Sequence, residues 1–143
     1  MKRSSLCAAI VSVAVLIFAT LGWANAADIH KAPPAHFKKV SELVQLPDYL
    51  PGLGTLYVDP KTLPVGPFLG YDRHSKLVNV VYMVPLSDID AHKAMTDLGT
   101  VAAGVKINHT DLEYNPGHPG VEVPHYHIVQ WLISHEQEQK GMK

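Results

Sequence analysis

The sequence predicts an α+β fold, an antiparallel sheet of four to five strands with two short helices packed on it. Two observations lead to this fold class. Short apolar segments typical of strands are bounded by turns rich in Pro and Gly. Two other stretches space their apolar residues three and four apart, as amphipathic helices do. The expected order along the chain is a helix, a strand, two strands, a helix and two strands.

The first 26 residues have the layout of a secretory signal peptide. Residues 2 and 3 are basic, residues 6–21 are almost entirely apolar, and the small-residue pattern ANA at 24–26 favours cleavage after Ala26. The apolar run is shorter than the ~20 residues that a membrane-spanning helix needs. We therefore expect a periplasmic or secreted protein that is free of the membrane once the signal peptide has been removed.

The composition of residues 27–143 limits the chemistry of the exported part. The single cysteine, Cys7, leaves with the signal peptide, so neither disulfides nor thiolate chemistry are expected. The remaining ten Lys and Arg face 13 Asp and Glu, without a basic block. This charge pattern gives no footprint for nucleic-acid binding and none for a membrane surface. By length, the exported part forms one domain.

The predicted elements follow the chain in order. Residues 27–54 form a lead-in with a short helix over 35–46, where apolar residues stand at helical spacing and Pro47 ends the pattern. A single α+β domain then covers 55–134, and a polar, frayed tail covers 135–143. Within the domain we expect elements in this order: a strand at 55–58, a hairpin of 67–72 and 76–86, a helix over 87–98, and strands at 106–114 and 125–134.

The last two predicted strands carry an unusual density of histidine. His118, His125 and His127 lie within ten residues of each other. Side chains two apart on a strand share a face and stand about 7 Å apart, so His125 and His127 point the same way. On the preceding strand His109, Asp111 and Glu113 share a face for the same reason.

A hairpin of these two strands would bring facing side chains to about 5 Å. The connection over 115–124 is longer than most hairpin loops, and its Gly and Pro residues would fold His118 or Glu122 back over the cluster. We therefore predict a divalent metal site with ligands His118, His125 and His127, and with His109 or Glu122 as candidates for a fourth. Imidazole with one carboxylate favours zinc or copper.

Two other interpretations of the histidines remain open. An imidazole beside Pro and Gly often bonds a loop carbonyl and fixes the loop, so one alternative is a structural network. The other is a catalytic or small-ligand site without metal. A metal-dependent enzyme would use Glu122 or Asp111 as base. No G-x-S-x-G or H-E-x-x-H motif is present, no small-molecule substrate is indicated, and a role without catalysis is favoured.

A further alternative is an interaction module of the cell envelope. An exposed sheet edge, or an apolar patch around Phe68, Tyr82 and Trp131, would build a homo-oligomer. In that case the histidines would only stiffen the loop. The remaining histidines of the chain, His135 among them, are expected to be solvated.

The segments GPFLGYD (66–72), VVYMVPL (80–86) and NPGHPGVEVPHYH (115–127) resemble the TTHB-like family of small exported bacterial proteins of unknown function. The resemblance covers residues 55–133, and it implies export, an α+β fold and self-association, but no activity. It also implies that His118 and His125 belong together. The chain departs from the family pattern at His127, where an acidic residue is usual, and at Val129, where a histidine is usual.

Overall fold

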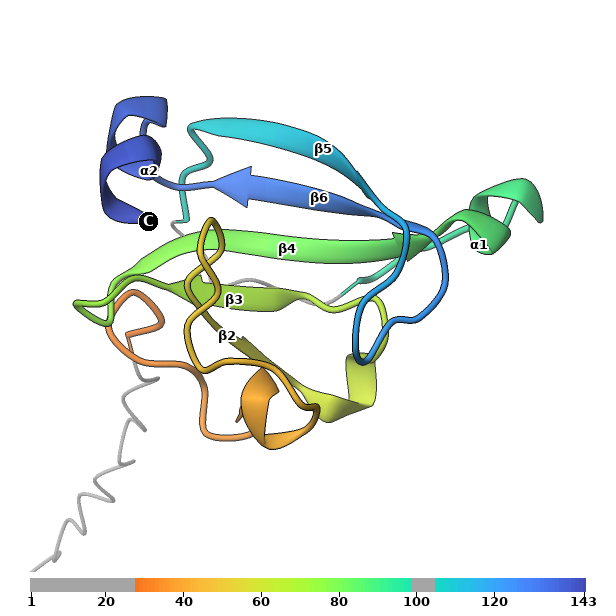
Figure 1. Ribbon diagram of the computed structural model, residues 1–143, viewed down its shortest axis with the longest axis horizontal. Coiled ribbons are helices and arrows are strands. Elements are labelled where there is room, and N and C mark those ends of the chain that lie inside the picture. The colour runs from red at the N-terminus through yellow and green to blue at the C-terminus, as the bar shows by residue number, and fades with distance from the viewer. Residues whose placement is uncertain (1–27, 99–104) are drawn as a thin grey trace, which may run out of the picture.

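The computed structural model describes residues 28–98 and 105–143, so the predicted signal peptide lies outside the described residues. One antiparallel sheet of six strands, in the order β1-β2-β3-β4-β6-β5, forms the centre of the fold (Figure 1). The strands are β1 Lys38–Lys39, β2 Thr55–Val58, β3 Phe68–Tyr71, β4 Leu77–Pro85, β5 His109–Asn115 and β6 His125–Trp131. The helices are α1 Leu86–Asp90 and α2 His135–Gly141, and two 3-10 turns are η1 Val40–Glu42 and η2 Pro60–Thr62. The α+β class is confirmed, with more strands than predicted.

The strands predicted in the second half of the chain are present. β3 and β4 pair as the expected hairpin. The carboxylate of Asp72 holds the turn between them, because it accepts from the backbone N–H groups of His74 and Lys76 at 2.8 and 2.9 Å. β5 and β6 also pair antiparallel, across the loop 115–124. β2 has the predicted bounds.

The helix predicted over residues 35–46 is wrong. Residues 38 and 39 instead form the edge strand β1 on β2, and only the short turn η1 follows. The apolar residues that gave the helical spacing are used by the core all the same, since Val40 is buried in it and Val44 packs against it. Pairing with a sheet edge satisfies the backbone groups here, so a tertiary contact decides the local structure.

The helix predicted over residues 87–98 is also wrong in length, because α1 ends at Asp90. His92 adopts the left-handed conformation, with φ at 53°, and this stops a right-handed helix. Ile89, which the predicted helix would direct toward the sheet, is exposed. α1 accordingly projects from the end of β4 instead of packing on the sheet (Figure 1).

The polar tail is ordered, contrary to prediction. Ser134 caps α2, and its side chain and that of Gln137 form a reciprocal capping box. Met142, just beyond the helix, is buried in the main core. Its carbonyl accepts a hydrogen bond of 2.7 Å from the backbone N–H of Gly52. The C-terminal segment is therefore part of the domain.

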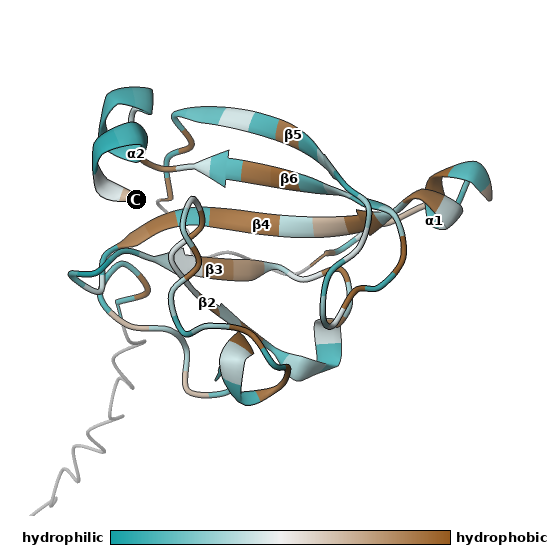
Figure 2. Cartoon of the chain, in the orientation of Figure 1, coloured by the Kyte–Doolittle hydropathy of each residue, from teal (hydrophilic) through white to brown (hydrophobic). Residues whose placement is uncertain are grey.

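The two faces of the sheet have different covers. On one face, which we call the inner face, Val129 and Trp131 of β6 pack with Val40 and Val121 from the connecting segments. Residues 40–54 and the loop 115–124 cover this face, while α2 lies at the end of β6 (Figure 1). Figure 2 shows β4 at the centre as largely hydrophobic and α2 as hydrophilic. No helix in residues 28–98 and 105–143 has the length and hydropathy needed to span a bilayer.

Candidate metal centre

A tight turn sets the position of His118 on the inner face. The backbone N–H and carbonyl groups of His118 and Val121 bond each other reciprocally, each at 3.0 Å. Pro119 and Gly120 occupy the two central positions, and Gly120 has φ at 92°. Proline followed by a residue with positive φ is the signature of a type II turn. Because Val121 is buried in the core, the turn anchors His118 against the sheet.

Gly117 determines how the chain enters this turn. Its φ is 130°, a value that side chains disfavour. A Cβ atom here would lie 2.7 Å from the carbonyl oxygen of Glu122. Its N–H donates to the side-chain oxygen of Asn115 at 2.8 Å. The sequence Asn-Pro-Gly-His-Pro-Gly thus folds as one compact loop that returns His118 to β6.

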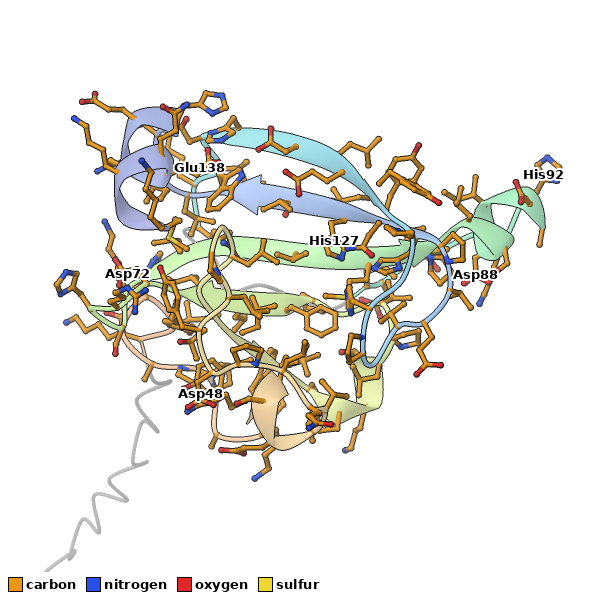
Figure 3. The ribbon with its side chains drawn as sticks, in the orientation of Figure 1. Asp48, Asp72, Asp88, His92, His127 and Glu138 are labelled. Atoms are coloured by element: carbon orange, nitrogen blue, oxygen red, sulfur yellow. The ribbon has the colours of Figure 1, made fainter. Side chains whose placement is uncertain are left out.

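The alternation of β6 brings the other two imidazoles to the same place. His125 and His127 are both buried, with 0% and 6% of their surface exposed. They lie two residues apart and therefore point to the same face. His127 stands opposite Met83 of β4 and Glu113 of β5 in the sheet register. Figure 3 shows His127 near the start of β6, between β6 and β4.

The three imidazoles converge through the same ring atom. The Nε2 atoms of His118 and His125 are 3.2 Å apart, those of His118 and His127 are 3.3 Å apart, and those of His125 and His127 are 3.0 Å apart. Ligand nitrogens at 2.0–2.1 Å from a tetrahedral zinc ion would be separated by about 3.3–3.4 Å. The three atoms therefore have nearly the spacing of one face of a zinc coordination tetrahedron.

Backbone carbonyls fix which nitrogen is free in two of the three rings, those of His118 and His125. Nδ1 of His125 lies 2.7 Å from the carbonyl oxygen of Val123, and Nδ1 of His118 lies 3.0 Å from that of Pro119. A carbonyl can only accept, so each Nδ1 carries the proton and each Nε2 presents a lone pair. Metal-bound histidines commonly have this arrangement, in which a carbonyl holds the outer N–H.

The surroundings of His127 favour its neutral form. Burial, together with the neighbouring imidazoles of His125 and His118, lowers the pKa of His127 to about 4. At neutral pH the ring of His127 is therefore uncharged. The Nε2 lone pairs of His118 and His125 repel each other at 3.2 Å, and a cation placed between them would remove the repulsion.

The other predicted ligands lie elsewhere. His109 pairs with Trp131, at the far end of β6. Four residues of strand separate that position from His127, about 13 Å, so His109 is out of reach of an ion held by His127. Glu122 is exposed on the loop, and Asp111 accepts a hydrogen bond of 2.8 Å from the indole N–H of Trp131. The structure thus brings together three of the five predicted ligands: His118, His125 and His127.

His109 belongs to a second group, with His135 and Glu138 of α2. One carboxylate oxygen of Glu138 lies 3.3 Å from a ring nitrogen of each histidine. The remaining ring nitrogen of His109 lies 3.1 Å from the side-chain oxygen of Asn108. Because both ring nitrogens of His109 already contact side-chain oxygens, this group can hold α2 against the sheet. Sequence reasoning missed it by treating residues 135–143 as a free tail; the capping pattern at Ser134 was the available signal.

A cavity of about 310 Å³ adjoins the three converging histidines. It lies between residues 40–54, the 115–121 part of the loop and the inner face of the sheet. His118 and His127 form part of its wall, whereas His125 does not. The three-histidine cluster therefore borders, on one side, a cavity that is partly open to solvent.

The chain is similar to a protein of known structure, hypothetical protein TTHB210 from Thermus thermophilus. The two share 47% sequence identity over 68% of this chain and 93% of that chain, with a TM-score of 0.60. The chain belongs to the TTHB210 family. No protein-family model matches it, and no curated protein is similar to it.

Membership of the TTHB210 family confirms the predicted resemblance at the level of the family. It also supports the fold, since the match spans nearly all of the Thermus protein. The Thermus protein is called hypothetical, and its name indicates no activity. Any function must therefore be argued from the side chains of this chain.

Proposed function

We propose that this protein is an exported metal-binding protein that holds one zinc or copper ion through Nε2 of His118, His125 and His127. The observation that carries the proposal is the convergence of these three atoms at 3.0–3.3 Å. Three imidazoles with a further position left open form a donor set that zinc uses in proteins. Export is supported by the signal-peptide layout of residues 1–26.

The donor set favours zinc over copper(I). Copper(I) prefers thiolate and thioether ligands, and the only cysteine is in the predicted signal peptide. Met83 is the residue that could supply a thioether, since it is buried opposite His127 and lines the same cavity. Copper(II) remains compatible with imidazole ligands. Both ions therefore belong in the test.

The decisive measurement is elemental analysis of the protein made from the full-length chain, after incubation with each ion and removal of excess metal. We expect one ion per chain in the wild type and loss of that ion in His118→Ala. His118 is the best residue to replace because it lies on the loop and is only half-buried. His92→Ala is the matched control, since His92 is exposed on the turn after α1 (Figure 3). Metal-free wild-type protein, or an equal metal content in both variants, would contradict the proposal.

Self-association is a second candidate, favoured by one feature of the surface. Leu112 and Tyr114 on the edge strand β5 are 65% and 57% exposed, on the face opposite the histidine cluster. Apolar side chains on an open edge favour pairing with another chain. The patch predicted around Phe68 and Trp131 is wrong, because both are buried in the core.

The two candidate functions can be separated by light scattering. An oligomer built through β5 should dissociate in Leu112→Glu and persist in the presence of chelator. An oligomer that the chelator dissociates would instead depend on the metal. A monomer under both conditions would remove this second candidate.

A further inference from the structure

The cavity beside the three histidines has a composition that narrows what it can bind. Its walls are formed by aliphatic and aromatic side chains from four parts of the chain, among them Leu46, Leu56, Phe68 and Val121. The polar side chains on the wall are Asn115, His118 and His127. Within the described residues, no Lys or Arg lines it. An apolar molecule fits these walls, whereas a charged one has no side chain to neutralise it.

The histidines supply a polar end to this otherwise apolar space. An ion held by three imidazoles keeps at least one coordination position for another ligand. Because His118 and His127 belong to the cavity wall and His125 does not, the cavity side is where an additional ligand has room. A carboxylate is an ordinary ligand of zinc, and the ion would provide the positive charge that the walls lack.

The volume of the cavity indicates the approximate size of the molecule that it could bind. Water occupies about 30 Å³ per molecule in the liquid, so 310 Å³ has room for roughly ten groups of that size. A straight-chain acid with about ten non-hydrogen atoms, such as octanoate, is of this order. The volume is at the lower end of the range for small-molecule sites.

We infer that the cavity binds a medium-chain aliphatic carboxylate, with the carboxylate on the metal at His118, His125 and His127 and the chain along the apolar walls. The inference rests on the proposed function, because no cationic side chain of the described residues lines the cavity and the metal would supply the counter-charge. It adds a ligand class to a site that would otherwise only store an ion. Since segments 40–54 and 115–121 both contribute to the walls, the ligand would also join these two segments.

The test uses calorimetry on the protein from the full-length chain, first loaded with zinc and separately freed of metal. We expect octanoate to bind the zinc-loaded protein, and the metal-free protein to bind it at least tenfold more weakly. Each methylene removed from the acid should weaken binding about fourfold, so butanoate should bind at least about 100-fold more weakly. In the cobalt(II)-substituted protein, octanoate should change the visible spectrum, because the carboxylate enters the coordination sphere. The alcohol 1-octanol should leave that spectrum unchanged.

Matched variants test the cavity without touching a predicted ligand. Leu46→Trp fills the space from a half-buried position on the wall and should abolish octanoate binding while one zinc is retained. Ile107→Trp makes the same kind of change at an exposed position outside the cavity lining and should leave octanoate affinity unchanged.

The outcomes distinguish this inference from the proposed function. A protein that retains zinc but does not bind octanoate, or binds butanoate equally well, overturns the inference and leaves the metal site standing. Octanoate binding that is the same with and without zinc, or a cobalt spectrum that octanoate does not change, overturns it as well. A protein that retains no metal overturns the proposed function, and the inference with it.

Discussion

Nδ1 of His125 donates a hydrogen bond of 2.7 Å to the carbonyl oxygen of Val123, two residues earlier in the chain. This contact lies just outside β6 and fixes the orientation of a ring that is completely buried. It leaves Nε2 as the only free nitrogen of the ring, directed at His118 and His127. The outer N–H of a metal-bound histidine is held in the same way in many proteins, so this contact fits the proposed role of His125 as a ligand.

Zinc should stabilise the folded protein. A ligand that binds only the native state adds about 4 kcal/mol to the free energy of unfolding when its concentration is a thousand times its Kd. We expect a rise in Tm with zinc, reversed by chelator, in thermal unfolding followed by circular dichroism. Calcium and magnesium should have no effect, since these ions prefer oxygen ligands. Unchanged Tm with both zinc and copper would argue against a preformed site.

Gly117→Ala should weaken zinc binding without removing a ligand. The added Cβ meets the backbone of Glu122, and the positive φ of Gly117 is strained for alanine, so His118 is displaced. Changes to groups that orient a ligand typically cost 10–100-fold in affinity, and we expect about tenfold or more. Gly141→Ala is the control, because a Cβ there contacts nothing within 4 Å. Competition with a zinc-binding dye measures both, and equal affinities would show that the loop does not position His118.

The metal-free protein should lose stability as the pH falls from about 6.5 to about 4. The pKa of His127 is lowered in the folded state, from 6.5 to about 4. The unfolded chain therefore binds more protons in this window, and the free energy of unfolding decreases as the pH drops. Below about pH 4 both states are protonated and this contribution is constant.

The measurement compares metal-free wild type with His127→Gln, which cannot titrate at this position. Between pH 7 and pH 5 we expect the Tm of the wild type to fall by about 5 °C more than that of the variant. The subtraction removes the titration of carboxylates that both proteins share. Equal decreases in the two proteins would mean that His127 is not held neutral by its surroundings.

His109→Ala should separate the two histidine groups. The substitution removes the contact between β5 and Glu138 of α2, at an expected cost of about 1 kcal/mol in the free energy of unfolding. Zinc content should remain at one per chain, because His109 stands about 13 Å along the sheet from His127. His118→Ala should show the opposite pattern, loss of zinc with little loss of stability in the metal-free protein. Loss of zinc in His109→Ala would show that the second group is the metal site.

The sequence was sufficient to predict the parts of the fold that depend on local signals. β2, β3 and β4 have strong strand patterns bounded by turns, and the structure places them there. The joint direction of His125 and His127 follows from the period of two in a strand. The proximity of His118 was predictable only as a consequence of loop length, because the turn that returns it depends on Val121 reaching the core.

The errors arose where distant segments decide the local structure. Residues 38 and 39 form a strand because they pair with the edge of β2. The sequence of residues 35–46 contains no signal for that pairing. The prediction grouped His109 with His125 and His127 because the sequence does not define the register of β5 on β6. In the structure His109 pairs with Trp131, at the other end of β6. Met142 is buried in the core formed by residues distant in the sequence, and the polar pattern of residues 135–143 gives no signal for that contact.

The spacing of His125 and His127 makes the site depend on the number of residues between them. A single residue inserted between them would send one imidazole through to the opposite side of the sheet, and two inserted residues would keep both on the inner side but move them to about 13 Å apart. Insertions in the loop 115–124 are less constrained so long as the turn at His118 survives. Among natural or designed descendants of this chain, any change in the number of residues between these two histidines should therefore remove the capacity for an ion.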